Sequence, residues 1–447
     1  MGRRGRVKFL REVAQGVTVT LAGRLRDRSA RVVVIGQGYV GLPLAVRASE
    51  VGFPVVGFEL DEGKVSLLEA GVSYIGDVTD ERLGQALARG FHPTANPADL
   101  SGFDIAVISV PTPLVEGRPD LTFIEAAGRS AAAHLRPGAC VVLESTTYPG
   151  TTEEFLAPIL ENGSGLGRGD YFLGYSPERV DPGNARFPFE ATPKVVSGDR
   201  AESLAVIEEF FGLLVNEVVP VATCAEAEMT KLLENTFRHV NIALVNELAR
   251  YAFELGVDIW TVIDAASTKP FGFMRFEPGP GVGGHCLPID PTYLAWKVRE
   301  HLGYSFRFVE LANDVNEHMP EYVVGRLTRM LNDESRPVRG SKILLLGLAY
   351  KAGTGDWRES PSAKIATQLI NLGAVVSICD PHVEPRSAGA YASLLVPFSS
   401  TTMEESDVVV LLVAHHEFDP EVIAATAPLV FDTRNILRGL EFRGEAL

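Results

Sequence analysis

The chain alternates short β-branched runs with longer stretches of helical character, and this alternation restricts its possible folds more than any other feature. Between Arg31 and about residue 180 the apolar runs are VVVIG, VVGFEL, IAVISVP, CVVLEST and YFLGYSP. Each run ends in a turn or a polar residue, a pattern typical of βαβ units in a parallel sheet. Because ligands of open α/β sheets lie at the carboxyl ends of the strands, we expect functional residues directly after these runs.

A second alternation begins at Lys342, with the runs ILLLGLAY, VVSICDP, DVVVLLV and LVFDTRN. Between the two, residues 225–256 carry apolar side chains at helical spacing and contain no proline or glycine before Gly256, a plausible C-cap. The sequence therefore predicts an α/β protein with two doubly wound, Rossmann-like domains joined by a long central helix. The expected segments are a helical extension at 1–29, a Rossmann domain at 30–222, a central helical domain at 223–325 and a second Rossmann-like domain at 326–447.

Composition and charge exclude several classes of protein. With 447 residues, 46% of them hydrophobic, the chain is long enough for two or three domains with their own cores. A net charge of −16 argues against binding to nucleic acid or to an anionic membrane surface, so an anionic ligand must meet local positive groups. No uncharged run reaches the length needed to span a membrane, and the basic segment 1–28 is interpreted as a leading helix.

The four cysteines are far apart in the sequence and lack both CxxC pairing and histidine partners at metal-site spacing. We therefore expect neither a disulfide framework nor a bound metal, and a reducing, cytoplasmic location.

The first run leads into the turn Gly36-Gln37-Gly38-Tyr39-Val40-Gly41. Glycines at this spacing allow a tight turn and let backbone amides and a helix N-terminus approach a pyrophosphate. Glu59 ends the next strand about twenty residues later, where a carboxylate binds ribose hydroxyls and repels a 2′-phosphate. The pattern predicts NAD as cofactor, used for oxidation. The alternative is that the glycines only allow close packing of strand and helix.

Four further residues suggest a site for oxidation through a covalent thioester. Cys286 lies in the glycine-rich string GGHCLPID, although a lone cysteine is often an inert packing residue. Lys231 and Asn235 are four residues apart and share one face of the long helix, where a lysine is often only a solvated charge. Glu178 follows a strand and could handle protons, or it could form a charged face with Arg179.

Seven strings together resemble the UDP-sugar 6-dehydrogenases: GQGYVGLPLA, VPTP, ESTTYPGTT, YSPERVDPGN, KLLEN, GPGVGGHCLPID and GLAYKAGTGDWRESP. They occur in the family's order from about residue 30 to 440. The strings SPERVDPGN, NIALVNELA and TKPFGF look most like the branch that oxidises UDP-N-acetylglucosamine and related 2-acetamido sugars, with UDP-glucose as the alternative substrate.

The resemblance implies a double oxidation of the C6 alcohol of the sugar to a carboxylate, with two NAD and one water. It also implies an NAD-binding first domain, a central helix that forms a homodimer or higher oligomer, and a C-terminal domain that helps to hold the UDP-sugar. The resemblance implies that Cys286 is the nucleophile and that Lys231 and Asn235 stabilise negative charge on the oxygen at C6. It implies that Asp290 orients a water or assists proton transfer and that Glu178 activates water. Thr146 is implied to position the water or the cofactor.

The resemblance also implies two sets of binding residues. Those for the cofactor are Gly36, Gly38, Tyr39, Val40, Gly41, Glu59, Lys64, Val110, Thr112, Ser145 and Thr146, with Arg358 as a residue that could reach across a dimer interface. Those for the UDP-sugar are Glu178, Arg179, Lys231, Asn235, Gly279, Gly281, Gly283, Tyr350, Lys351 and Arg434. Lys351 and Arg434 would supply the local positive charge that a diphosphate needs on an acidic protein.

The sequence departs from the family pattern at several positions. Glu59 stands where an aspartate is common, and nearby Asp61 could share its role. Pro182 replaces a second glutamate that UDP-glucose enzymes usually carry, which weakens the assignment of UDP-glucose. Arg275 and Glu277 stand where the acetamido-sugar branch usually has proline and tyrosine. These last two leave the choice of sugar open.

Overall fold

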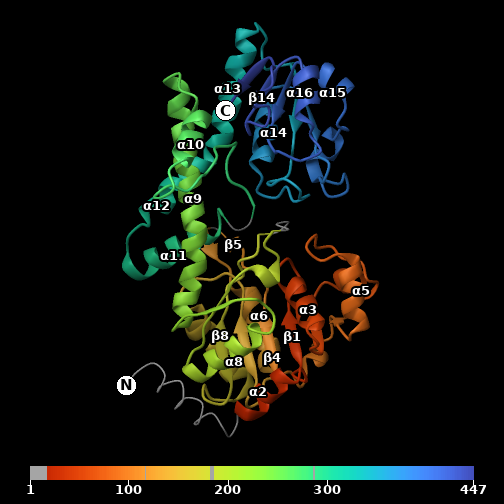
Figure 1. The fold of residues 1–447 in the computed structure, drawn as a ribbon, viewed down its shortest axis with the longest axis vertical. Helices are drawn as coiled ribbons and strands as arrows, with labels where there is room; N and C mark the ends of the chain where they lie inside the picture. The colour runs from red at the N-terminus through yellow and green to blue at the C-terminus, as the bar shows by residue number, and fades with distance from the viewer. Residues whose placement is uncertain (1–17, 116, 182–185, 285–286) are drawn as a thin grey trace. The chain divides into compact units, whose positions relative to one another are not determined.

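The computed structural model describes residues 18–115, 117–181, 186–284 and 287–447. The chain divides into two compact units, Met1–Glu234 and Asn235–Leu447, and each is described by itself (Figure 1). His285 and Cys286, together with Pro182, lie outside the described residues.

The first unit is built on a six-stranded parallel sheet with the strand order β3-β2-β1-β4-β7-β8. This is the order of a dinucleotide-binding Rossmann domain, in which the chain changes direction between β1 and β4. All five predicted runs form strands, and a short edge strand, β3, is added to them. The strands are β1 (Val32–Ile35), β2 (Val55–Phe58), β3 (His92–Thr94), β4 (Ile105–Ile108), β7 (Cys140–Leu143) and β8 (Phe172–Tyr175).

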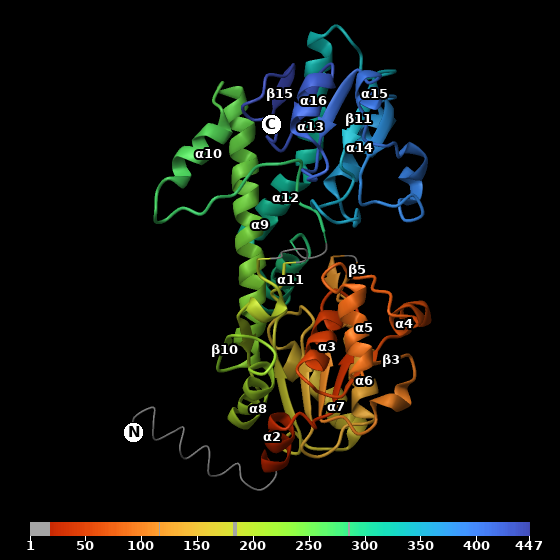
Figure 2. The same ribbon diagram turned by 45° about the vertical axis from the view of Figure 1, so that its right-hand side comes forward.

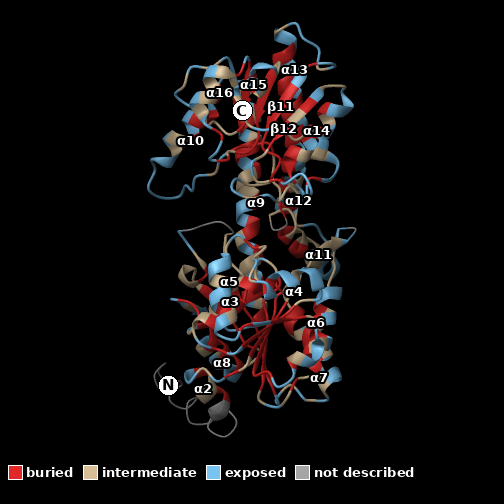
Figure 3. Ribbon diagram, turned by 90° about the vertical axis from the view of Figure 1, so that its right-hand side faces the viewer, coloured by how far each residue is buried: buried red, intermediate tan, exposed pale blue. Residues whose placement is uncertain are grey.

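Both faces of this sheet are buried, as expected for parallel strands whose connecting helices cover both sides. Successive residues of β1 enter different cores, because side chains of a strand alternate between faces: Val32 and Val34 join one, Val33 and Ile35 the other. Figure 3 shows the strands as buried between more exposed helices. The helices are α2 (Thr18–Arg26), α3 (Gly41–Glu50), α4 (Glu62–Glu69), α5 (Asp80–Ala88), α6 (Thr122–Ala132), α7 (Ala157–Ser164) and α8 (Ala201–Phe211).

Two smaller sheets flank the central one in this unit. Strand β9 (Lys194–Val196) pairs in parallel with β10 (Val218–Pro220), and β5 (Leu114–Val115) forms a short antiparallel hairpin with β6 (Arg118–Pro119). The three residues of β9 are all buried, so this strand places Lys194 in the interior.

Helix α9 (Cys224–Glu254) is one continuous helix of 31 residues, as the sequence predicts (Figure 2). Gly256 follows it with φ = 68°, the left-handed conformation that ends many helices and that glycine adopts without strain. Lys231 and Asn235 lie one turn apart on this helix.

The second unit contains a five-stranded parallel sheet with the order β12-β11-β13-β14-β15. The four predicted runs form β11 (Lys342–Leu346), β12 (Val375–Cys379), β13 (Val408–Leu411) and β14 (Val430–Asp432), and the edge strand β15 (Gly444–Ala446) is added. The helices are α10 (Ile259–Ser267), α11 (Asp290–Leu302), α12 (Arg307–Glu317), α13 (Met319–Asp333), α14 (Pro361–Asn371), α15 (Ser400–Glu404) and α16 (Pro420–Thr426). The predicted pair of Rossmann-like folds linked by helices is thus confirmed.

Within the part of the chain that the structure describes, no helix combines the length and the apolar character needed to cross a membrane.

Candidate functional site

The glycine turn lies at the carboxyl end of β1, where the direction of the sheet changes. Gly36 has φ = 94°, and a Cβ atom there would lie 2.6 Å from the carbonyl oxygen of Ser109, which follows β4. A Cβ on Gly41 would lie 1.9 Å from the carbonyl oxygen of Gly36, so α3 can begin there only because this residue has no side chain. Packing therefore explains Gly36 and Gly41.

Gly38 is different, because a Cβ atom there would meet nothing within 4 Å. Neither its φ angle nor packing inside the protein requires a glycine at this position. The remaining reason is close approach of a ligand to the backbone, which is the role that the middle glycine has in a dinucleotide-binding turn. The turn is therefore built to accept a pyrophosphate.

Glu59 lies beside the turn, at the end of β2, and its carboxylate faces the beginning of α3. Its Oε2 accepts a hydrogen bond from Gln37 N at 3.1 Å and lies 4.0 Å from Lys64 Nζ. Asp61 is occupied differently, because its Oδ1 accepts from the amides of Gly63 and Lys64 and so caps α4. Glu59 Oε1 also accepts from Asp61 N at 3.2 Å, so backbone amides hold both carboxylates, and Glu59 is the one that contacts the glycine turn.

The strand ends next to β1 supply the other expected cofactor residues. Ser145, after β7, donates its hydroxyl to the carbonyl of Val110, after β4, at 2.7 Å. Thr146 is half-buried, and Thr147 is fully buried with no hydrogen-bond partner for its hydroxyl among the described residues. The expected role of Thr146 stays a prediction.

A cavity of about 300 Å³ adjoins the glycine turn. Tyr39 and Val40 line one part of it, and Glu178 with Phe189 lines another. Tyr39 and Glu178, which are about 140 residues apart in the sequence, therefore line the same cavity. This cavity connects the expected cofactor turn with the carboxylate that is expected to activate water. The remaining lining residues are Pro43, Gly76, Asp77, Arg82, Val180, Asp181 and Pro188.

Glu178 is held firmly at the rim of this cavity. Its Oε1 accepts from the amides of Arg179 and Val180 at 2.7 and 2.6 Å, and its Oε2 lies 2.8 Å from Lys194 Nζ. Burial by itself would raise the pKa of Glu178, but Lys194, the amide of Val180 and Lys231 outweigh it and hold the pKa below the usual range. Lys194 also pairs with Glu144, which directly follows β7. Sequence analysis predicted neither Lys194 nor Glu144 as part of the site.

Arg179 does not form the charged face with Glu178 that the sequence left as an alternative. Its guanidinium pairs with Glu234 of α9 at 2.7 Å and donates to the carbonyl of Pro193. Lys231, one turn earlier on α9, contributes to the low pKa of Glu178 through its positive charge. Lys231 therefore lies close enough to Glu178 to act electrostatically on the same site.

In the second unit, two expected catalytic side chains meet. The amide of Asn235 donates a hydrogen bond to Asp290 Oδ2, and both residues are buried. Asp290 begins α11, four residues after Cys286, which lies outside the described residues. The hydrogen bond fixes the side-chain amide of Asn235 in one orientation.

The other three cysteines are buried and free. Burial raises the pKa of Cys140 far above its usual range and that of Cys224 and Cys379 to about 12. These thiols stay protonated at neutral pH, so none of them is a candidate nucleophile.

The glycine-rich loop at 279–284 packs against residues expected to bind the UDP-sugar. A Cβ on Gly279 would lie 2.4 Å from Arg434 Nη1, and one on Gly284 would lie 2.8 Å from the ring of Tyr350. Gly283 is equally confined, at 2.7 Å from the carbonyl of Glu359, and Gly281 has φ = 130°. The second unit therefore brings this loop together with Tyr350 and Arg434.

A network of buried asparagine side chains holds the same glycine-rich loop by hydrogen bonds. Asn246 accepts from Gly279 N at 2.9 Å and donates to Asn316 at 2.9 Å. Asn316 in turn lies against His239, whose Nε2 contacts Asn313 at 2.7 Å. Burial lowers the pKa of His239, so this imidazole remains neutral and the network carries no charge.

Arg358, an expected cofactor residue, forms a surface ion pair, and so do Arg275 and Glu277, the two positions that depart from the family pattern. Arg358 is exposed and pairs with Asp356 at 2.8 Å, and its expected role across a dimer interface stays a prediction. Arg275 bridges Asp264 and Glu277 at 2.6 and 2.9 Å. Glu277 also acts electrostatically on Arg434, so this divergent position lies near the expected sugar site.

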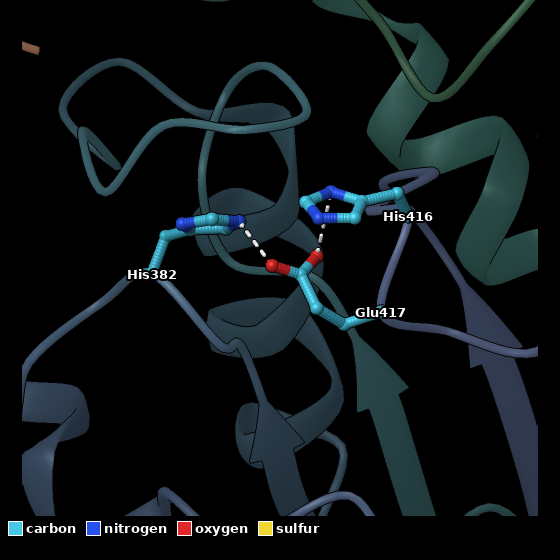
Figure 4. Close-up of side chains that lie close together, drawn as sticks. All are labelled: His382, His416 and Glu417. Atoms are coloured by element: carbon cyan, nitrogen blue, oxygen red, sulfur yellow. Dashed lines mark ion pairs between the residues drawn. The ribbon is translucent and has the colours of Figure 1, made fainter.

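A cluster of possible metal ligands lies on the second unit, away from these residues in sequence. Glu417 pairs with His382 at 3.0 Å and with His416 at 3.1 Å, and the three side chains point toward one another (Figure 4). Imidazoles and a carboxylate are ligands that zinc accepts. However, His416 is 81% exposed, and mutual ion pairing accounts for the arrangement without a metal.

Comparison with known proteins decides the family. The chain is 36% identical over 394 residues to the UDP-N-acetyl-D-glucosamine 6-dehydrogenase of Pseudomonas aeruginosa, covering 88% of this chain and 92% of that protein. Models of the UDP-glucose/GDP-mannose dehydrogenase family match residues 30–215 as the NAD binding domain, 225–318 as the central domain and 344–439 as the UDP binding domain. The chain belongs to this family. It is an NAD-dependent UDP-sugar dehydrogenase.

Two solved structures are similar to the dehydrogenase over 93% of its length. One is the UDP-D-ManNAc dehydrogenase of Pyrococcus horikoshii, with a TM-score of 0.83, 34% identity and 98% of that chain covered. The other is a UDP-glucose dehydrogenase from Pyrobaculum islandicum, with a TM-score of 0.84, 27% identity and 97% covered. The fold is thus shared by enzymes named for different sugars.

The glycine turn yields a prediction that separates packing from cofactor binding. Gly38→Ala should leave thermal stability within about 1 °C of wild type, since a Cβ there meets open space, but should weaken NAD binding by about tenfold or more. Gly36→Ala is the matched control, because it places a side chain at positive φ against Ser109 and should lower the melting temperature by several degrees. Unchanged NAD affinity in a folded Gly38→Ala protein would contradict the assignment.

Proposed function

We propose that the dehydrogenase oxidises C6 of UDP-N-acetylglucosamine or a related UDP-N-acetylhexosamine to the uronate. The observation that carries the proposal is the cavity shared by the cofactor turn and Glu178, because a carboxylate beside the cofactor suits an oxidation that ends in hydrolysis. Support for an acetamido sugar comes from the relatives named for UDP-N-acetyl-D-glucosamine and UDP-D-ManNAc, at 36% and 34% identity. UDP-glucose is the alternative, favoured by the similar fold of the Pyrobaculum islandicum enzyme.

The cofactor fits the residues of the first unit. Gly38 leaves the backbone open to a pyrophosphate, and Glu59 presents an acceptor for ribose hydroxyls. When bound, NAD accepts hydride from C6 in each of the two oxidations. Tyr39 and Val40, which line the cavity, are proposed to position its nicotinamide end.

The family resemblance implies Cys286 as the nucleophile, and the protonation state of the other thiols supports this proposal. The three described cysteines are buried and stay protonated, so Cys286 is proposed to attack the C6 aldehyde and hold it as a thiohemiacetal. Oxidation of that adduct gives a thioester. Lys231 and Asn235 are proposed to stabilise the negative charge on the C6 oxygen, since preorganised cationic and amide donors lower such barriers most. Asp290 would hold the amide of Asn235 in place through their hydrogen bond.

Hydrolysis of the thioester needs a base for the attacking water, and Glu178 is proposed for it. Glu178 lines the cavity, and its low pKa keeps the carboxylate ionised at neutral pH. Thr146, half-buried beside Ser145, is proposed to position this water or the cofactor.

The glycine loop, Tyr350, Lys351 and Arg434 are proposed to bind the UDP moiety. Arg434 contributes a guanidinium that lies directly against Gly279, so a diphosphate near this loop would meet a positive charge. Arg179 and Lys351 are further proposed substrate contacts.

A panel of UDP-sugars tests the proposed function. Incubation with NAD should produce two NADH per UDP-N-acetylhexosamine, with kcat/KM at least about tenfold above that for UDP-glucose. A preference for UDP-glucose would select the alternative substrate. No NADH with any UDP-sugar would refute the proposed reaction.

We also propose that the enzyme forms a homodimer through α9. Phe237, Leu244, Leu248, Tyr251 and Leu255 are large apolar side chains that remain exposed on or directly after this helix, Leu255 by 77%. Their spacing of seven, four, three and four residues places them along one stripe. A continuous stripe of this kind marks an interaction surface.

The double substitution Leu244→Glu and Leu248→Glu should dissociate the proposed dimer. Two charges in a buried apolar seam cost several kcal/mol, enough to raise the dissociation constant by about 10³-fold or more. Analytical ultracentrifugation measures the result. Arg238→Gln, at an exposed position of the same helix outside the stripe, is the control, and an unchanged sedimentation coefficient in the double variant would refute this interface.

A further inference from the structure

The ion cluster behind Glu178 contains one more carboxylate than charge balance requires. Lys194 pairs with both Glu144 and Glu178, and the side chains of these three residues are only 0%, 3% and 12% exposed in the order Glu144, Lys194, Glu178. The faces of Phe189 and Phe211 lie 5.4 Å from the same ammonium group. One lysine thus serves two buried carboxylates, and the cluster carries a net charge of −1 when all three groups are ionised.

The two carboxylates differ in what they can reach. Glu178 lines the cavity, whereas Glu144 does not and is fully buried at the end of β7. Oε2 of Glu144 has no hydrogen-bond partner among the described residues, an arrangement that costs stability. A lysine and Glu178 alone would form a neutral pair, so stability does not explain why the second carboxylate is present.

The geometry gives the second carboxylate a consequence for Glu178. Three donors already hold the Glu178 carboxylate: two backbone amides and Lys194. Such donors make a carboxylate a weak base, because they stabilise its ionised form. Burial raises the pKa of Glu144 to about 7, with Lys194 opposing and Glu178 adding to the shift. Glu144 is therefore neutral while Glu178 titrates. Above about pH 7 it ionises, shares the ammonium group and opposes the effect of the three donors.

We propose that Glu144 and Lys194 are positioning residues that set the basicity of Glu178: Lys194 fixes the carboxylate, and Glu144 offsets the charge of the lysine. The inference rests on the proposed role of Glu178 in thioester hydrolysis. In that step Glu178 takes one proton from water, the water oxygen bonds to the carbonyl carbon, and the sulfur of Cys286 leaves as the thiolate. No redox partner is consumed.

Other charged groups face Glu178 and stay constant in the test. Lys231 of α9 favours the ionised carboxylate. Asp77, Arg82 and Asp181 line the same cavity. Because these groups are retained, a change produced by substituting Glu144 or Lys194 is attributable to the cluster itself.

Two variants with different effects test the proposal. Glu144→Gln removes a charge that forms through about pH 7, so the rise in the rate of thioester hydrolysis that wild type shows across this pH should be lost, with a plateau above it about tenfold slower. Lys194→Met removes the cation, so the acid limb that reports Glu178 should move to higher pH. The covalent adduct is formed with NAD and UDP-N-acetylglucosamine, quenched at intervals, and its decay is followed by intact mass spectrometry.

Glu228→Gln is the matched control. Glu228 is another buried carboxylate, held by the amides of Gly150 and Thr152, and it does not line the cavity. Burial raises the pKa of Glu228 to about 7 as well, yet this variant should keep the rise in rate through that pH. If Lys194→Met fails to fold, Glu144→Asp provides the second variant, which keeps an ionisable carboxyl group and should keep a rise in rate that Glu144→Gln loses.

The outcomes separate this inference from the function on which it rests. A hydrolysis rate that rises through about pH 7 in folded Glu144→Gln as it does in wild type, while wild type forms and hydrolyses the adduct, overturns the inference alone. An acid limb that stays in place in folded Lys194→Met also overturns it, since Lys194 then has no effect on the basicity of Glu178. Absence of any adduct in wild type overturns the proposed function and this inference together.

Discussion

Cys286→Ser should reduce net oxidation of the UDP-sugar by at least about 10³-fold while NAD binding is retained. The serine hydroxyl is nearly isosteric with the thiol, but it is not ionised at neutral pH and forms no thioester. No other described cysteine can replace it, because Cys140, Cys224 and Cys379 are buried with raised pKa values. NADH production at saturating substrate and a fluorescence titration with NAD measure the two properties separately.

Cys379→Ala is the matched control for this experiment. It removes a thiol from the end of β12, outside the proposed catalytic residues, and should retain activity with a modest loss of stability. Full turnover by Cys286→Ser would remove the covalent step from the mechanism. Loss of NAD binding in the same variant would instead show a general disruption of the site.

Glu178→Gln should stop the reaction at the thioester. Two hydride transfers precede hydrolysis, so we expect a rapid burst of two NADH per active site followed by turnover about 10²- to 10⁴-fold slower. Glutamine keeps the size of the side chain but cannot accept a proton from water. The fold should tolerate the change, because Lys194 keeps Glu144 as its partner.

Rapid-quench mass spectrometry should detect the accumulated adduct on Cys286 in this variant. Glu228→Gln, which removes a buried carboxylate elsewhere in the first unit, should show neither the burst nor the adduct. Wild-type hydrolysis by Glu178→Gln would show that another group activates the water. Loss of the burst itself would indicate that Glu178 acts before the thioester forms.

Most of the secondary structure could be predicted from the sequence because its signals are local. β-Branched runs gave the nine predicted strands, and apolar spacing gave the long helix with its glycine end. The edge strands β3 and β15 were missed, since each has only three residues and neither is a continuous apolar run. Edge strands are paired on one side only and need little apolar sequence of their own.

The candidate site was predictable only where a motif carries its own chemistry. The string around Gly36 suggested a cofactor turn, the string around Glu178 a general base, and the string around Asn235 an amide that stabilises charge. Nothing in the strings ESTT or PKVV indicated that Glu144 and Lys194 would meet. Their contact joins positions 50 residues apart, and it forms because the fold brings the residue after β7 next to the first residue of β9.

The glycine turn shows how far the sequence alone could go. It determined that the chain makes a tight strand-to-helix turn suited to NAD, because only glycine permits that backbone path. The tertiary structure decided why each glycine is needed: Ser109 and Gly36 crowd the first and third, while the second borders open space. It also decided the ionisation of Glu178, because the electrostatic environment of a carboxylate depends on which charges the fold brings within a few ångströms, and their order in the chain does not reveal this.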